Sequence, residues 1–466
     1  MMTTHPPGPK SWLPGGQLIH FRRDPLALLI SLARDFGDVA HFRIGPQNAY
    51  LINDPEAIRR VLVTDADNFI KGRALQRAKR LLGEGLLTSE NPIHRRQRRL
   101  AQPAFHRARI ATYAEKIVEC AAETAAVWQA GATVDLAHEM NRLALSVVSR
   151  TLFDTNTEEE ADDIEQAMTS MLALFQYLLL PYTEILERLP LPQVRRFNKA
   201  RERLDKVIYR IIAEHRANLK EGVDRGDLLS MLLLAQDEED EAGAGVDGMT
   251  DEQVRDEAMT IFLAGHETTA NALAWTWYFL GTNPEVERRL HVEVDEVLRS
   301  ADGGLRLPMA DDYARLPYTE QVFAESMRVR PPAWTIGRLA KRDYETLGYT
   351  LPVGSLILMS QFVMHHDARY YPEPERFDPE RWTPEAKQSR HPYTYFPFGG
   401  GARRCIGEGF AWMEGVLVLA TLASRWRMRL VPDQRIEMRP LITLRPKYGV
   451  RAVLEARSEA HAVAAD

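Results

Sequence analysis

Residues 396–412 read Phe-Pro-Phe-Gly-Gly-Gly-Ala-Arg-Arg-Cys-Ile-Gly-Glu-Gly-Phe-Ala-Trp. The three successive glycines permit backbone angles that other residues avoid, and they let a flat ligand approach the chain closely. A helical pattern follows, from about residue 406 to residue 423, so we expect Cys405 at the amino end of a helix. The helix dipole and the neighbouring arginines favour the thiolate form of such a cysteine. Taken alone, the same residues also suit a small buried cysteine beside a turn.

Most of the remaining chain has apolar residues at helical spacings of three and four. Short strands are predicted as a hairpin over 39–52, around Gly45-Pro46, and near 350–360 and 442–454. The predicted fold class is therefore mainly α, of the α+β kind. No linker-like stretch divides the 466 residues, which predicts a single domain over 1–466. Helices are predicted at 24–36, 110–130, 137–153, 158–179, 193–220, 251–280, 284–300 and 318–328.

The composition excludes several classes of protein. A net charge of −6 does not suit a general nucleic-acid binder, which would be strongly basic. Two cysteines, Cys120 and Cys405, do not make a disulfide scaffold, and this usage fits a reducing cytosol. Cys120 lies in an ordinary helical stretch and is expected to be structural. The chain lacks a signal-peptide pattern and a membrane-spanning apolar run, so we expect a soluble, cytoplasmic protein.

A second unusual stretch, residues 261–270, reads Ile-Phe-Leu-Ala-Gly-His-Glu-Thr-Thr-Ala within a long apolar helix. Ala264 and Thr268 are four residues apart and share a helix face, with Glu267 beside it. The apolar flanks predict that this turn is buried, and buried polar groups need partners or a purpose.

The cysteine stretch resembles the haem-binding loop of the cytochrome P450 superfamily. Phe398 stands seven residues before Cys405, Gly401 four before, Arg403 two before and Gly407 two after, as in that pattern. The resemblance implies that Cys405 is the axial ligand of the iron of haem b. It also implies that Arg403 pairs with a haem propionate, that Phe398 packs near the sulfur, and that both glycines leave room for the macrocycle.

The polar turn resembles the oxygen-activating helix of the same superfamily. By that resemblance Thr268 and Glu267 are catalytic: Thr268 hydrogen-bonds the oxygen being activated and Glu267 relays protons from solvent. Splitting the O–O bond requires two protons, which a hydroxyl and a carboxylate can deliver. Ala264 is expected to lie at the haem and to border the substrate.

Further residues match family positions elsewhere in the chain. His94, Arg98 and Arg338 are implied to hold haem propionates, although the first two also suit a solvated basic helix. The resemblance further implies a structural triad that holds the core on the cysteine side, formed by Glu325, Arg328 and Arg381.

The resemblance implies a triangular prism with a large helical part and a smaller β-rich part, and no fused reductase. The implied activity is hydroxylation or epoxidation of an apolar substrate, such as a fatty acid, terpenoid or other lipid. Two electrons come from NAD(P)H through a ferredoxin or flavodoxin-type donor and its reductase, and a monomer is expected. The expected substrate pocket is lined by Leu82, Leu86, Leu87, Leu178, Phe262, Ala264, Ala333 and Trp334.

Two alternatives remain from the residues alone. A peroxide-using haem-thiolate enzyme usually lacks the acid–threonine pair, so Glu267 and Thr268 favour activation of O₂. A non-catalytic haem-binding protein would have no need of a proton relay. Consumption of NAD(P)H and O₂ distinguishes the monooxygenase from both.

Overall fold

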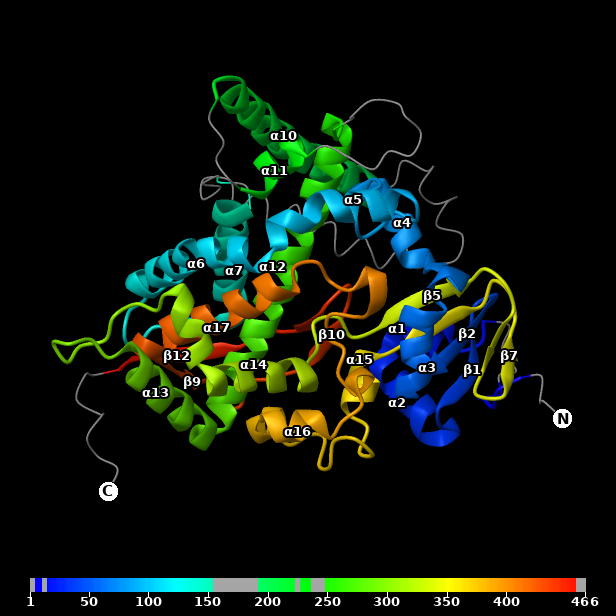
Figure 1. Ribbon diagram of the computed structural model, residues 1–466. Helices are drawn as coiled ribbons and strands as arrows, with labels where there is room; N and C mark the ends of the chain where they lie inside the picture. Colours follow the sequence, from blue (N-terminus) through cyan, green and yellow to red (C-terminus); the bar gives the residue numbers. More distant parts are fainter. Residues whose placement is uncertain are drawn as a thin grey trace. The chain divides into compact units, whose positions relative to one another are not determined.

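A computed structural model describes residues 5–10, 15–152, 154, 192–222, 227–235 and 248–457 (Figure 1). The chain divides into two compact units, the first rich in strands and the second rich in helices. The single domain expected over 1–466 stays a prediction. The first unit comprises Met1–Arg77, Ala324–Cys405 and Arg439–Arg445, and the second comprises Ala78–Phe323, Ile406–Met438 and Pro446–Asp466.

A five-stranded sheet organises the first unit. Its strand order is β1-β2-β8-β5-β3, and only β2 and β8 pair in parallel. A separate hairpin joins β6 to β7, and the turn before β8 contains Gly354 at a φ of +76°. The strands are β1 Val39–Ile44, β2 Gln47–Ile52, β3 Phe69–Lys71, β5 Ile336–Ala340, β6 Tyr344–Thr346, β7 Tyr349–Leu351 and β8 Leu356–Met359.

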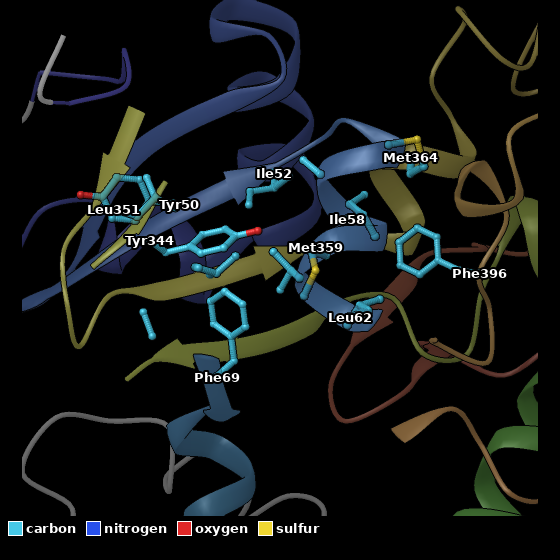
Figure 2. Close-up of a cluster of buried hydrophobic side chains, with 14 residues drawn as sticks. Tyr50, Ile52, Ile58, Leu62, Phe69, Tyr344, Leu351, Met359, Met364 and Phe396 are labelled. Carbon is cyan, nitrogen blue, oxygen red and sulfur yellow. The ribbon is translucent and has the colours of Figure 1, made fainter. Parts of the chain in front are cut away.

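Buried apolar side chains from the sheet, from residues 57–62 and from later parts of the unit form a core (Figure 2). Tyr50, Phe69 and Met359 come from strands, and Ile58 comes from α3 (Pro55–Arg59). The first unit also holds the short helices α1 (Leu18–Arg23), α2 (Pro25–Phe36), α15 (Gln361–His365) and α16 (Pro384–Gln388).

The irregular segment before α1 covers the outer edge of the sheet. The His41 amide of β1 donates to the Pro7 carbonyl at 2.8 Å, and the Gln17 amide donates to the Arg43 carbonyl at 2.7 Å. A Cβ atom on Gly8 would lie 1.8 Å from the His41 oxygen. The segment therefore approaches β1 as closely as only glycine permits.

The second unit is built on α12 (Asp251–Thr282), which a capping box of Thr250 and Gln253 begins. Among the helices that pack around it or its neighbours are α6 (Arg107–Val127), α7 (Leu136–Leu152), α13 (Pro284–Leu298) and α17 (Glu408–Arg425). Gly265 lets α7 come close, since a Cβ there would lie 3.0 Å from Val148 Cγ2. Most of α12 is buried, as its apolar flanks predict.

The remaining elements complete the chain. In the second unit, β12 (Arg451–Ala456) lies between β4 (Thr133–Asp135) and β9 (Trp426–Leu430). The predicted helix over 158–179 lies outside the described residues, and no described helix has the length and apolarity needed to cross a membrane. The other elements are α4 Arg73–Leu82, α5 Ile93–Ala101, α10 Pro192–Lys220, α11 Leu228–Leu234, α14 Pro317–Val329, β10 Met438–Pro440 and β11 Leu444–Pro446.

Candidate functional site

The cysteine loop, residues 398–405, is closed by its own backbone. The Cys405 amide donates to the Phe398 carbonyl at 2.9 Å. Cys405 is exposed, whereas Cys120 is buried in α6, as expected for a structural cysteine. The helix after the loop begins at Glu408, two residues later than predicted, because Gly407 takes the N-cap position. Cys405 therefore precedes the helix rather than lying in its first turn.

Gly401, in the cysteine loop, and Gly407, two residues after the cysteine, differ in whether the surrounding protein requires a glycine. Gly401 has a φ of +67°, and a Cβ there would lie 2.1 Å from the Leu62 oxygen. Packing within the first unit is therefore enough to require glycine at 401. Gly407 has a φ of −86°, and a Cβ there would meet Phe105 only at an ordinary 3.6 Å. The described protein atoms alone do not require glycine at 407.

The other site residues expected in the first unit are only partly buried or take part in packing. Phe398 and Arg403 are half-buried in the cysteine loop. Arg338 is half-buried on β5, opposite Lys71 of β3. Trp334 is buried, and its indole N–H donates to the Leu441 carbonyl at 3.0 Å, whereas Ala333 is half-buried. Trp334 therefore has a defined position within the first unit.

In the second unit, the middle of α12 opens on one face. Ala264 is exposed and Thr268 is half-buried, although Phe262 and Thr269 nearby are buried. The Thr268 hydroxyl donates to the Ala264 carbonyl at 2.6 Å, the usual bond of a helical threonine to the preceding turn. Small side chains on an otherwise buried helix leave space for a bulky group on this face.

The neighbouring polar residues of this turn have different environments. His266 is buried and its Nε2 lies 3.0 Å from the Asn141 carbonyl of α7. Burial lowers the pKa of His266 to about 4, so its ring is neutral near pH 7. Glu267 is also buried, and its carbonyl accepts from Asn271 at 2.9 Å. His266 is thus a packing residue against α7.

Sequence reasoning missed several buried carboxylates of the second unit, among them Asp256, Glu257 and Glu414. Burial raises the pKa of Glu414, on α17, to about 8, and the nearby Thr269 hydroxyl offsets only part of this effect. For Glu414 the signal was present in the sequence, because it interrupts a helical stretch that is otherwise mostly apolar, whereas Asp256 and Glu257 lie in a charged stretch and give no such signal.

The short helix α5 carries both predicted basic haem contacts. His94 is buried and Arg98 is half-buried, whereas Arg95 and Arg99 are exposed. The solvated-face interpretation therefore describes Arg95 and Arg99 and does not describe His94. The buried face also contains Gln97, whose amide donates to the Glu84 carbonyl at 2.7 Å.

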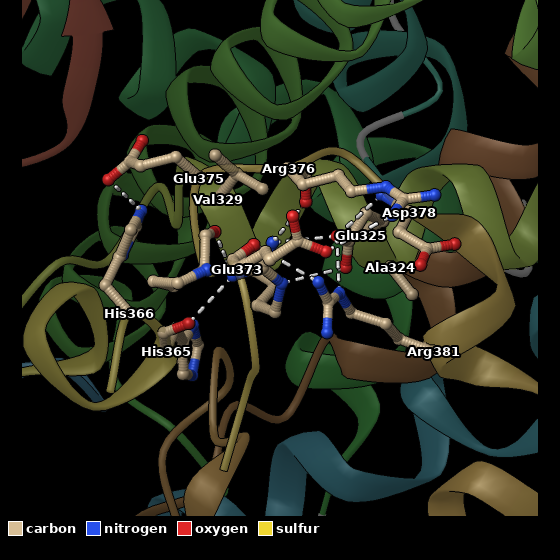
Figure 3. Close-up of polar contacts among 12 residues, drawn as sticks. Ala324, Glu325, Val329, His365, His366, Glu373, Glu375, Arg376, Asp378 and Arg381 are labelled. Atoms are coloured by element: carbon tan, nitrogen blue, oxygen red, sulfur yellow. Dashed lines mark hydrogen bonds and ion pairs between the residues drawn. The ribbon is translucent and has the colours of Figure 1, made fainter. Parts of the chain in front are cut away.

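The structure brings Glu325, Arg328 and Arg381 together within the first unit (Figure 3). Glu325 and Arg328 are fully buried and form a two-fold contact at 2.9 and 2.8 Å. Arg381 Nε lies 3.5 Å from Glu325 Oε1. The Trp382 indole and the Asp378 amide each donate to the Glu325 carboxylate at 2.9 Å. One carboxylate therefore joins α14 to the chain around residues 378–382.

The expected pocket residues of the second unit lie on or beside α12 and at the end of α4. Leu82, Leu86 and Phe262 are buried, and Leu87 is exposed. The Leu86 amide donates to Glu257 of α12 at 3.1 Å, which places Leu86 beside that helix. Leu178 lies outside the described residues.

These features fit haem b as a bound group. The cysteine loop offers an exposed thiol, and Gly407, at the N-cap of α17, is a glycine that the described protein atoms do not require. The open face of α12 consists of small side chains on which a planar apolar group can lie. Half-buried Arg338 and Arg403 supply the positive charge that carboxylates seek.

Comparisons with known proteins agree with this fit. The family model described as Cytochrome P450 matches residues 6–450. The chain is 42% identical to cyclooctatin synthase of Streptomyces melanosporofaciens, over 95% of this chain and 96% of that protein. It is 39% identical to cyclooctat-9-en-7-ol 5-monooxygenase of the same species, over 90% and 88%. It is 36% identical to pentalenene oxygenase of Streptomyces avermitilis, over 95% of each protein.

A solved structure gives the same result for the fold. The haem domain of cytochrome P450DA matches with a TM-score of 0.86 at 25% identity, covering 98% of this chain and 99% of that one. The mainly helical fold with a smaller β part is therefore confirmed. An enzyme of this kind takes electrons from a redox partner and acts on a small apolar substrate. The chain belongs to the cytochrome P450 family, and it is a haem-thiolate monooxygenase that carries haem b.

Proposed function

We propose that this enzyme hydroxylates a terpenoid. The observation that carries the proposal is the agreement among relatives matched along most of their length, two of which are named for oxygenation of the terpenoids cyclooctat-9-en-7-ol and pentalenene. We further propose that a ferredoxin or flavodoxin and its NAD(P)H reductase supply the electrons, and that the protein works as a cytoplasmic monomer. The reaction takes C–H, O₂, two electrons and two protons to C–OH and H₂O.

The proposed binding of haem b uses residues of both motifs. Cys405 provides the axial sulfur, and its exposure in a loop closed by the Phe398 carbonyl supports this role. Arg403, Arg338, His94 and Arg98 are proposed to hold the propionates. When bound, haem b supplies the binding of dioxygen and the electron-transfer chemistry.

The proposed proton delivery uses Glu267 and Thr268. The Thr268 hydroxyl donates to the Ala264 carbonyl, so its oxygen can accept a hydrogen bond from water on the open face of α12. Glu267 is buried next to it in sequence and is proposed to bring protons from solvent. A positioned acid of this kind contributes about 10²–10⁴-fold to a proton-dependent step.

The expected substrate contacts support an apolar substrate. Leu86, Leu87, Phe262 and Trp334 carry no charge that would anchor a carboxylate. A terpenoid skeleton needs the same kind of surface, because its binding comes mainly from buried apolar area. A fatty acid would be expected to use a charged anchor as well, which none of these residues supplies.

The test uses the purified holoenzyme with a ferredoxin, its reductase and NADPH. Pentalenene and cyclooctat-9-en-7-ol serve as terpenoid probes, and a fatty acid serves as the comparison. We expect a substrate-induced spectral shift and an NADPH- and O₂-dependent hydroxylated product with a terpenoid probe. A shift and product with the fatty acid alone would overturn the substrate class. Turnover with hydrogen peroxide and none with NADPH would overturn the electron source.

A further inference from the structure

Two consecutive carboxylates of α12 hold a short segment of the second unit, residues 83–89. The Glu84 amide donates to Asp256 Oδ2 at 2.8 Å, and the Leu86 amide donates to Glu257 Oε2 at 3.1 Å. Asp256 and Glu257 are both buried. A buried carboxylate bonded to a backbone amide is a strong, directional contact. The position of the segment is therefore tied to the helix at two successive points.

The segment lies against α12 at a distance that only glycine allows. A Cβ on Gly83 would lie 1.9 Å from Asp256 Oδ2, and a Cβ on Gly85 would lie 2.2 Å from Thr260 Oγ1. Gly83 also has a φ of +57°. The Thr88 hydroxyl closes the segment by donating to the Gly83 carbonyl at 2.6 Å. The segment is a compact turn fitted to one patch of the helix.

Asp256 is itself held by a charge network. Arg255 Nη1 donates to Asp256 Oδ1 at 2.9 Å, and Arg255 Nε donates to Asp205 Oδ1 of α10 at 2.7 Å. Arg255 and Asp256 are buried, so their contact is shielded from water, and the contact of Arg255 with Asp205 is partly buried. The network links α10, α12 and the 83–89 segment within the second unit.

The patch includes the helix face that carries Thr268. Glu257, Ala264 and Thr268 lie on one face of α12, because separations of seven and eleven residues are close to whole numbers of helical turns. Asp256 and Thr260 lie beside this face, and the segment contacts both of them and Glu257. At 1.5 Å of rise per residue, Thr268 lies about 12 Å beyond Thr260 along the axis. A substrate lying over Ala264 is therefore within reach of the segment.

We propose that Asp256 and Glu257 are positioning residues that determine where on the substrate oxygen is inserted. They fix the 83–89 segment, and with it Leu86 and Leu87, at one end of the open α12 face. Movement of this segment changes which carbon of an apolar skeleton lies nearest Thr268. The inference rests on the proposed function, because it takes the substrate to lie over Ala264 and Thr268.

The first measurement is hydrogen exchange in the holoenzyme variants Asp256→Ala and Glu257→Ala. We expect the Glu84 amide in the first variant and the Leu86 amide in the second to exchange about tenfold faster or more, because each loses its carboxylate acceptor. Asp256→Asn keeps an acceptor oxygen and should retain part of the protection. Glu252→Ala is the matched control, since Glu252 is exposed in the first turn of the same helix. Unchanged exchange in all variants would contradict the role of Asp256 and Glu257 in holding the 83–89 segment.

The second measurement is the ratio of positional isomers formed from a substrate that the unmodified enzyme oxidises. We expect this ratio to shift several-fold in Asp256→Ala and Glu257→Ala and to stay constant in Glu252→Ala, with an unchanged carbon-monoxide band in all three variants. Faster exchange with an unchanged isomer ratio would overturn the positioning role. If the proposed function is wrong, the unmodified enzyme forms no terpenoid product, which is a separate result. The ratio of positional isomers is then measured with a fatty acid as the substrate.

Discussion

The hydroxyl of Thr268 bonds to the carbonyl one turn before it, and this bond is common to helical threonines. Thr276 makes the same contact, with the Ala272 carbonyl at 2.7 Å, but Thr276 is fully buried. The two residues therefore have similar backbone contacts and differ in access to the open face of α12. This pair separates a role in oxygen activation from a role in helix geometry.

We predict that Thr268→Ala loses coupling between electron use and product formation. Product per NADPH should fall about tenfold or more, with the missing electrons recovered as hydrogen peroxide, because proton delivery is impaired. Thr268→Ser should keep most of the coupling, and Thr276→Ala should keep nearly all of it. Peroxide measured against product checks this, and equal coupling in Thr268→Ala and Thr276→Ala would contradict it.

A second pair of like residues tests the cysteine loop. Cys405→Ser should abolish the reduced carbon-monoxide absorption band typical of thiolate-bound haem, because a hydroxyl does not replace the thiolate sulfur. Cys120→Ser is the matched control, since Cys120 is buried in α6 and should leave the band in place. Persistence of the band in Cys405→Ser would refute the assignment of the axial ligand.

At the scale of helices and strands, the long regular segments were predictable and their ends less so. Apolar spacing predicts 251–280, and the helix runs from Asp251 to Thr282. The helix after the cysteine begins two residues later than expected, because Gly407 takes the N-cap. The spacing of residues in the sequence does not predict which groups Asp256 and Glu257 bond to. Those partners are backbone amides 171 and 172 residues away in sequence.

The buried carboxyl of Glu414, on α17, makes the stability of the folded protein depend on pH. With a pKa near 8 in the folded protein against 4.5 in the unfolded chain, it stays protonated in the fold while the unfolded chain releases its proton. Stability then falls as pH rises from about 4.5 to about 8. Between pH 5 and pH 8, the free energy of unfolding of Glu414→Gln should rise by on the order of a few kcal/mol relative to that of the unmodified protein.

Urea unfolding at the two pH values measures this gain. Glu296→Gln, at an exposed position of α13, serves as the control and should show the same difference from the unmodified protein at both values. A Glu414→Gln gain that does not increase toward pH 8 would show that Glu414 ionises within the fold.

At the scale of the whole molecule, the fold class followed from the sequence but the division into two units did not. Apolar spacing shows which segments are helical, and it carries no information on which distant segments pack together. Glu325 and Trp382 are 57 residues apart and meet through one hydrogen bond. The resemblance to a known family supplied Glu325, Arg328 and Arg381, because their spacing in sequence is not a geometric signal. The sequence also did not predict that Gly401 lies against the backbone of Leu62.

The integrity of the first unit should depend strongly on Glu325. Its removal leaves Arg328 buried without its carboxylate, and breaking a buried ion pair costs about 3–5 kcal/mol. We predict that Glu325→Ala loses unfolding free energy on that scale and is recovered with little haem. Glu373→Ala removes an exposed carboxylate that pairs with Arg376 and should change stability by less than about 0.5 kcal/mol. Urea unfolding and haem content are measured for both variants. Normal haem content in Glu325→Ala would contradict the structural role of Glu325.

The irregular segment that crosses β1 has a consequence for how copies of this protein behave together. An outer strand with unpaired amides and carbonyls is a template for another chain. Here the Pro7 carbonyl and the Gln17 amide occupy such groups on β1, and the closeness at Gly8 leaves no gap for a foreign strand. The prolines beside Gly8 add no amide that could extend the ladder. The segment therefore occupies hydrogen-bonding groups of β1 that a strand of another molecule would need, which disfavours edge-to-edge association at this strand.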